Sequence, residues 1–170
     1  KESISNKDIS LENLSFAYKK GEPVLRGIDL ELPAGNSLAI VGPTGSGKTT
    51  MVKLLTRQYD ISEGVLKIGQ HNIKDYPREE LKRHIVMVPQ DPAIFHESVI
   101  FNIGLGRPEV SVEQIKDICR KIKADKFIQQ LENGYETNLT EGGQNLSCGQ
   151  RQLLAMARAL ASPAEILIFD

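Results

Sequence analysis

Residues 37–50 read SLAIVGPTGSGKTT, and this stretch decides the fold expected of the chain. The almost fully apolar run at 37–41 predicts a short strand that is covered on both faces. A glycine-rich turn follows at 42–49, and apolar side chains at helical spacing within 49–59 predict a helix after the turn. A strand, a glycine-rich turn and a helix in this order are typical of an α/β core.

The turn matches the pattern G-x-x-x-x-G-K-[ST], whose residue types suit a phosphate group. Glycines let successive amides turn inward around phosphate oxygens, and the start of a helix adds partial positive charge. The Lys48 ammonium can then face the β- and γ-phosphates, and the Thr49 hydroxyl can ligate Mg²⁺. The alternative is a glycine-rich turn with a surface lysine. The candidate phosphate-binding residues are Gly42, Pro43, Thr44, Gly45, Ser46, Gly47, Lys48, Thr49 and Thr50.

Elements on either side of this stretch extend the α/β pattern. Residues 9–18 and 24–32 alternate between apolar and polar side chains, which predicts an antiparallel layer. The other expected elements are strands at 65–68 and 85–88, helices within 98–132, a helix at 150–161 and a buried strand at 165–170. We therefore expect an α/β core, residues 1–90 and 150–170, with an inserted helical subdomain at 91–149.

Composition limits the classes of protein that the chain can represent. Its 170 residues, 40% of them hydrophobic and 25% charged, suit one globular domain. The net formal charge of −1 gives no general electrostatic reason to expect nucleic acid or an anionic membrane as a partner. The longest apolar run covers only 153–157, far short of the roughly 20 residues that a spanning helix needs. Two cysteines are too few for a disulfide framework, which favours a reducing compartment.

An acidic residue is expected near a phosphate-bound Mg²⁺, and Asp170 is the candidate. It ends the apolar strand ILIF, which we expect beside the strand that feeds the phosphate loop. The alternative role for an aspartate at a strand end is the N-cap of a following helix.

Residues 146–150 read LSCGQ and resemble the LSGGQ signature of ABC ATPases. Together with the phosphate loop and the strand that ends at Asp170, the signature makes residues 9–170 similar to the nucleotide-binding domain of an ABC transporter. The resemblance implies a P-loop NTPase core with an antiparallel β layer and an inserted helical subdomain that carries the signature at its end. Cys148 departs from the usual glycine of the signature and could be a reactive thiol or an inert small residue.

The resemblance also implies roles for individual residues. Tyr18 would stack on adenine, although a plain strand aromatic is the alternative. Gln90 lies in a Q-loop-like segment and would reach Mg²⁺ and the attacking water. The implied catalytic residues are Lys48, Gln90 and Asp170, and the implied Mg²⁺ ligands are Thr49, Gln90 and Asp170. The implied contacts to the ATP bound by a partner domain are Ser147, Gly149 and Gln150.

Two further stretches resemble the exporter branch of the family: the run DPAIF to IGLG within 91–106, and the loop 137–143, with Glu141 in its acidic position. The resemblance implies an ATPase that couples ATP-driven, head-to-tail dimerisation to translocation by a fused transmembrane domain, at the cytoplasmic face of the membrane. No nucleic acid partner is expected. Two alternatives stay open: a soluble, non-transporting ABC ATPase, and a catalytically degenerate half of a heterodimeric transporter.

In the family, a catalytic glutamate, a D-loop and a switch histidine follow the residue that corresponds to Asp170. The sequence stops at Asp170, so we expect the C-terminal part of the fold to be missing from this chain. We also expect the chain to bind ATP but to hydrolyse it poorly.

Overall fold

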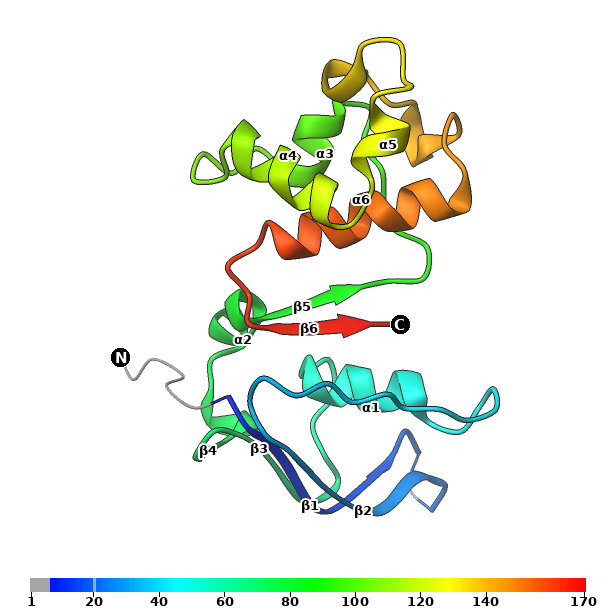
Figure 1. Ribbon diagram of the computed structural model, residues 1–170. Coiled ribbons are helices and arrows are strands. Elements are labelled where there is room, and N and C mark those ends of the chain that lie inside the picture. Colours follow the sequence, from blue (N-terminus) through cyan, green and yellow to red (C-terminus); the bar gives the residue numbers. More distant parts are fainter. Residues whose placement is uncertain (1–6, 20) are drawn as a thin grey trace. The chain divides into compact units, whose positions relative to one another are not determined.

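The computed structural model describes residues 7–19 and 21–170 and divides into two compact units, one ending at Ile85 and one running from Val86 to Asp170 (Figure 1). The first unit contains β1 (Ile9–Ala17), β2 (Pro23–Leu32), α1 (Lys48–Leu55), β3 (Glu63–Ile68), β4 (His71–Asn72), the 3-10 turn η1 (Ile73–Asp75) and α2 (Arg78–His84). The second contains β5 (Ile85–Val88, whose first residue closes the first unit), α3 (Val99–Gly104), α4 (Val112–Lys121), α5 (Asp125–Ile128), the 3-10 turns η2 (Gly134–Glu136) and η3 (Glu141–Gly143), α6 (Cys148–Leu160) and β6 (Ile166–Phe169).

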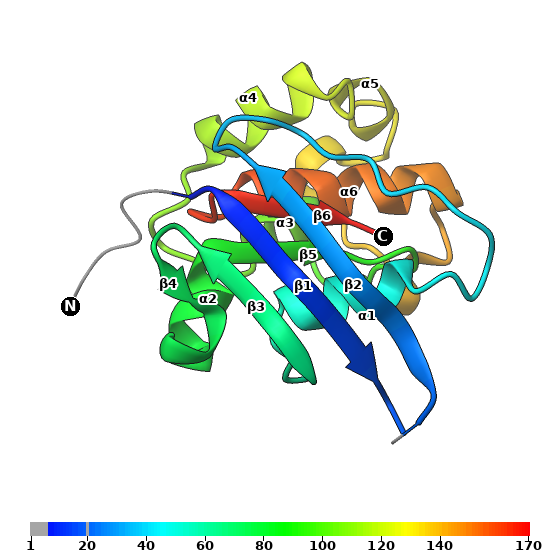
Figure 2. The same cartoon turned by 90° about the horizontal axis from the view of Figure 1, so that it is seen from below.

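The first unit is built on an antiparallel sheet in the order β2-β1-β3-β4. Ile9 of β1 pairs with Leu32 of β2 on one side and with Ile68 of β3 on the other. Alternate side chains of the central strands enter the core, where Leu14 and Leu66 are fully buried. Figures 1 and 2 show α1 against one face of this sheet. The antiparallel layer predicted from residues 9–18 and 24–32 is confirmed.

The helix after the glycine turn is shorter than the sequence predicts. The apolar spacing predicts a helix over 49–59, whereas α1 ends at Leu55. Arg57, two residues further on, has φ 50°, which lies in the left-handed region and cannot continue a right-handed helix. The backbone therefore turns away from the helix axis before it reaches Tyr59.

The predicted strand at 37–41 is wrong for this structure. These residues form neither helix nor strand, and the side chains of Leu38, Ile40 and Val41 are 45%, 45% and 88% exposed. A strand exists only where its amides and carbonyls pair with a neighbouring strand. Within residues 7–19 and 21–170, the strand pairings do not include 37–41, so this apolar run is not a strand despite its composition.

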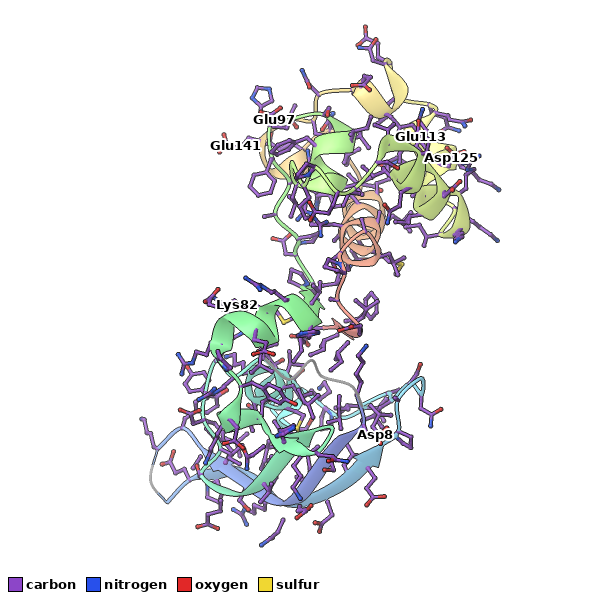
Figure 3. The ribbon with its side chains drawn as sticks, turned by 90° about the vertical axis from the view of Figure 1, so that its left-hand side faces the viewer. Asp8, Lys82, Glu97, Glu113, Asp125 and Glu141 are labelled. Carbon is purple, nitrogen blue, oxygen red and sulfur yellow. The ribbon has the colours of Figure 1, made fainter. Side chains whose placement is uncertain are left out.

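The second unit has a helical core of its own. Val99 and Ile103 of α3, Ile115 of α4 and Leu154 of α6 are almost completely buried in one cluster. Ser111 accepts a hydrogen bond from the Gln114 amide at the start of α4, whose first turn also carries Glu113 (Figure 3). In the part of the chain that the structure describes, no helix is both long and apolar enough to cross a bilayer. The predicted boundaries of the insertion at 91–149 stay a prediction.

The strands β5 and β6 run parallel to each other at the edge of the second unit (Figure 1). The Asp170 amide donates to the Val88 carbonyl at 3.1 Å, which extends this pairing to the end of both strands. The sequence predicts a buried strand at 165–170, but β6 is only partly covered, and Phe169 is 54% exposed. The sequence predicts that β6 lies beside a strand at 37–41. Residues 37–41 form no strand, and β6 pairs with β5 instead in the described part of the chain.

Candidate functional site

The glycine-rich turn before α1 has a backbone that only glycine adopts without strain. Gly45 and Gly47 have φ values of 84° and 93°, in the left-handed region. A Cβ atom on Gly47 would also lie 2.7 Å from the Cδ2 atom of Leu25, which is closer than carbon atoms approach. The conformation and the packing therefore both require glycine at this point, where the chain enters the helix.

The first turn of α1 presents amide groups that an anion can use. Gly47 is the N-cap and has no side chain to accept a hydrogen bond from these amides. The first hydrogen bond of the helix runs from the Met51 amide to the Gly47 carbonyl at 2.9 Å, so the amides of residues 48–50 precede it and have no intrahelical acceptor. Free amides and the positive end of the helix dipole together favour a phosphate group.

Lys48 lies across the same turn. Its Nζ atom donates to the carbonyl oxygens of Gly42 at 2.8 Å and Pro43 at 2.9 Å. An ammonium group carries three N–H donors, so one remains for a phosphate oxygen after these two bonds. The two carbonyls hold a full positive charge at the glycine-rich turn, and a charged donor makes a stronger hydrogen bond to a phosphate oxygen than a neutral amide does.

The two threonines after Lys48 have different environments. The Thr49 side chain is exposed, whereas Thr50 is 6% exposed. The Thr50 hydroxyl lies 3.1 Å from the hydroxyl of Tyr18, and the two form a hydrogen bond. The structure therefore brings Tyr18, the candidate base-stacking residue, against the helix that begins at the phosphate loop.

Two neighbours of Tyr18 were missed at the level of sequence. The Tyr59 ring centroid lies 5.1 Å from that of Tyr18, in an edge-to-face arrangement, and Lys53 Nζ lies within 6 Å of both centroids. Only 5% of the residues are aromatic, so a second tyrosine at the last position of the predicted helix was a signal for this pairing.

The signature residues lie at the start of α6 in the second unit. Ser147 is the N-cap; its hydroxyl accepts from the Gln150 amide at 3.2 Å, and the Gln150 side chain accepts from the Ser147 amide at 2.8 Å. This reciprocal pair is a capping box, so Gln150 is engaged within the helix terminus. Ser147, Cys148 and Gly149 are exposed, which leaves the helix start accessible to a ligand.

Gln90 and Asp170 lie at one edge of the second unit. Gln90 follows β5 by two residues, and Asp170 follows β6 directly. Because the strands are parallel, both residues come at carboxyl ends that meet at the same edge. Both side chains are exposed. This edge therefore offers an amide oxygen and a carboxylate, the oxygen donors that Mg²⁺ takes in proteins.

The two cysteines are expected to differ strongly in reactivity. Cys119 is fully buried, and desolvation raises the pKa of its thiol to about 11, while Cys148 is exposed. A raised pKa keeps a thiol protonated and unreactive below that value, so at pH 8 only about one Cys119 in 1,000 would be a thiolate. We expect N-ethylmaleimide at pH 8 to modify Cys148 and to spare Cys119, as read by mass spectrometry of the peptides. Similar rates at both thiols in the folded chain would contradict this, and unfolding in urea should equalise them.

Comparison with known proteins supports a single family. The family described as "ABC transporter" matches residues 25–170. The ABC transporter ATP-binding protein YknV of Bacillus subtilis, described as uncharacterized, is 42% identical over 165 residues, 97% of this chain and 27% of that protein. The lactococcin-G-processing and transport ATP-binding protein LagD of Lactococcus lactis is 42% identical over 170 residues, 98% of this chain and 24% of that protein. The chain thus spans about a quarter of the length of these relatives.

A solved structure shares the fold. The bacterial Atm1-family ABC exporter with ATP bound superposes with a TM-score of 0.90 at 34% identity, covering 99% of this chain and 30% of that one. This likeness confirms the expected P-loop NTPase fold of mixed α/β type with an antiparallel sheet. With the family match over most of the chain, and with a phosphate loop at α1 and a signature at α6, the chain belongs to the ABC transporter family and represents its ATPase domain.

Proposed function

We propose that this chain is the ATP-binding part of the motor domain of an ABC exporter, which couples ATP binding and hydrolysis to translocation by a membrane domain. The observation that carries the proposal is the phosphate loop, where free amides at the start of α1 and the Lys48 ammonium face the same turn. Phosphoryl transfer to water needs a protein that positions the phosphates and stabilises their negative charge. The free amides and the Lys48 ammonium can do both. The relatives named above are transporters, which favours this function over a soluble ABC ATPase.

In this proposal the triphosphate is held by residues 42–50, and the adenine stacks on Tyr18. Thr49 is proposed as a Mg²⁺ ligand in the first unit, and Gln90 and Asp170 as Mg²⁺ ligands in the second. Residues 7–19 and 21–170 contain no cluster of three or more His, Cys, Asp or Glu side chains that could hold a metal ion. Hydroxyl, amide and carboxylate oxygens nevertheless suit Mg²⁺, which keeps several waters and takes its other ligands from nucleotide phosphates. Bound in this way, Mg²⁺ would neutralise charge on the phosphates.

The proposed partners are a second ATPase domain and the transmembrane domain of the transporter, and the proposed location is the cytoplasmic face of the membrane. The start of α6 supports the first partner, because Ser147 and Gly149 are exposed at a helix N-terminus and can contact the γ-phosphate held by Lys48 of a second copy. ATP shared between two copies would favour the closed dimer by its higher affinity for that state.

Equilibrium dialysis tests the proposed function by measuring how much labelled ATP the chain binds with and without Mg²⁺. We expect saturable binding in the presence of Mg²⁺ and weak binding after EDTA is added. ATP bound no more tightly than AMP would contradict the proposal, because the phosphate loop contributes only through the β- and γ-phosphates.

Ser147 has two roles that can be tested separately: the proposed contact with ATP of a second copy, and the cap of α6. Ser147→Ala should lower the free energy of unfolding by about 1 kcal/mol through loss of the cap, and should abolish the association of two chains that ATP induces. Sedimentation velocity with and without ATP and Mg²⁺ measures the association. Ser111→Ala is the control, because the Ser111 hydroxyl also caps a helix, accepting from the Gln114 amide at the start of α4, and its loss should lower stability without affecting association. If ATP induces the same association in both variants, the proposed contact of Ser147 with the partner's ATP is wrong.

A further inference from the structure

The Tyr18 ring packs in a small aromatic group with Phe16 and Tyr59, and none of these rings belongs to the phosphate loop. The centroid of Phe16 lies 4.9 Å from that of Tyr18 with the planes at 86°, and Tyr59 lies 5.1 Å from Tyr18 with the planes at 89°. Lys53 Nζ lies 5.7 Å from the Tyr18 centroid and 5.9 Å from the Tyr59 centroid. Edge-to-face ring pairs and a cation over a ring are both attractive, so these neighbours restrict the orientation of Tyr18.

Exposure separates the members of this group. Phe16 is 4% exposed and belongs to the core of the sheet, whereas Tyr18 is 45% exposed and Tyr59 is 43% exposed. A ring as exposed as Tyr59 contributes little to the core. Its main contacts with other rings are those to Tyr18 and Phe16, so its effect is expected on the Tyr18 side chain more than on the stability of the unit.

Two residues of α1 contact the Tyr18 side chain. Thr50, in the first turn of α1, bonds the Tyr18 hydroxyl. Lys53 is one turn further along, and its carbonyl accepts from the Gln58 amide at 2.8 Å and from the Tyr59 amide at 3.5 Å, which fixes the segment that carries the Tyr59 ring. The same helix begins at the phosphate loop. The Tyr18 side chain is therefore hydrogen-bonded to the same helix whose first turn carries the free amides.

We infer that Tyr59, together with Lys53, is a positioning residue for the nucleotide base: it orients the Tyr18 ring so that the base and the triphosphate are bound at one fixed separation. This inference rests on the proposed function. Tyr59 itself does not need to touch the nucleotide, because it acts through the ring of Tyr18.

The inference is tested by comparing the affinity of the chain for ATP with its affinity for inorganic tripolyphosphate. Only ATP carries a base, so a residue that positions the base should affect ATP alone. Calorimetric titration of the chain, with Mg²⁺ present, gives both dissociation constants. We expect Tyr18→Leu to weaken ATP binding by about 10-fold or more, as loss of a stacked base implies. Tyr59→Leu should weaken ATP binding by about 3- to 10-fold, which is the range for loss of an aromatic pair. Tripolyphosphate binding should change less than about 2-fold in both variants.

Three further variants sharpen this comparison. Tyr59→Phe keeps the ring and should restore ATP affinity. In the double variant Tyr18→Leu/Tyr59→Leu, the second substitution should add nothing, because its effect passes through the ring already removed. Phe101→Leu is the matched control, because Phe101 is a partly exposed ring in an edge-to-face pair with Phe95 in the second unit and should leave both affinities unchanged.

The outcomes distinguish the inference from the function on which it rests. If the unaltered chain binds neither ATP nor tripolyphosphate, the proposed function fails and the inference fails with it. If Tyr18→Leu lowers the preference for ATP and Tyr59→Leu does not, the inference alone is overturned. Equal loss of ATP and tripolyphosphate in Tyr59→Leu would show a general structural role and would also overturn it.

Discussion

Lys48→Ala is expected to raise the dissociation constant for ATP with Mg²⁺ by about 10- to 150-fold, which corresponds to the loss of a hydrogen bond to a charged group. The Lys48 ammonium is held over the turn by the carbonyls of Gly42 and Pro43, and its remaining N–H is available to a phosphate. Alanine removes both the donor and the positive charge, so the free amides alone must neutralise the triphosphate. The calorimetric titration described above measures the change.

A second lysine in the first unit provides the control for Lys48. Lys82 lies on α2, pairs with Glu79 at 2.8 Å and has a side chain that is 71% exposed (Figure 3). Lys82→Ala removes the same charge from an exposed surface ion pair, which solvent screens, so both stability and ATP affinity are expected to stay close to those of the unaltered chain. If Lys48→Ala binds ATP as well as Lys82→Ala does, the turn before α1 is not the phosphate site.

Asn102→Ala is expected to lower the free energy of unfolding by about 2–4 kcal/mol, the largest stability effect that we predict. Asn102 is completely buried in α3. Its side chain accepts from the Phe95 amide at 2.8 Å and donates to the carbonyls of Phe95 at 3.0 Å and of Glu97 and Ser98 at 3.1 Å. Alanine removes all four of these hydrogen bonds, which connect the buried Asn102 side chain to the backbone at 95–98. Urea unfolding followed by circular dichroism measures the loss.

An exposed asparagine in the same unit is the control for Asn102. Asn138 lies opposite Ser98 in an isolated β-bridge, and Asn138→Ala should stay within about 0.5 kcal/mol of the unaltered chain. Hydrogen exchange adds a local measurement, because the Phe95 amide should exchange faster in Asn102→Ala. Equal unfolding free energies for the two variants would show that the Asn102 side chain does not hold the loop at 95–98.

Local sequence was sufficient wherever neighbouring residues supply the interactions themselves. The phosphate loop depends on glycines at left-handed positions and on a helix directly after them, and both lie within 42–50. The start of α6 depends on Ser147 and Gln150, which bond each other across one turn. These features were predictable because the interacting atoms are only a few residues apart.

Tertiary structure decided the features whose partners lie far along the chain. The apolar run at 37–41 has the composition of a buried strand, yet it is not one here, because pairing depends on a second strand and not on composition. Tyr59 likewise gives no sign in the sequence that it packs on Tyr18, 41 residues earlier. The sequence by itself determined the phosphate loop, the signature helix and the family, since each is written in contiguous residues. Only the folded chain determined which rings and which strands meet, because those contacts join residues that lie far apart in the sequence.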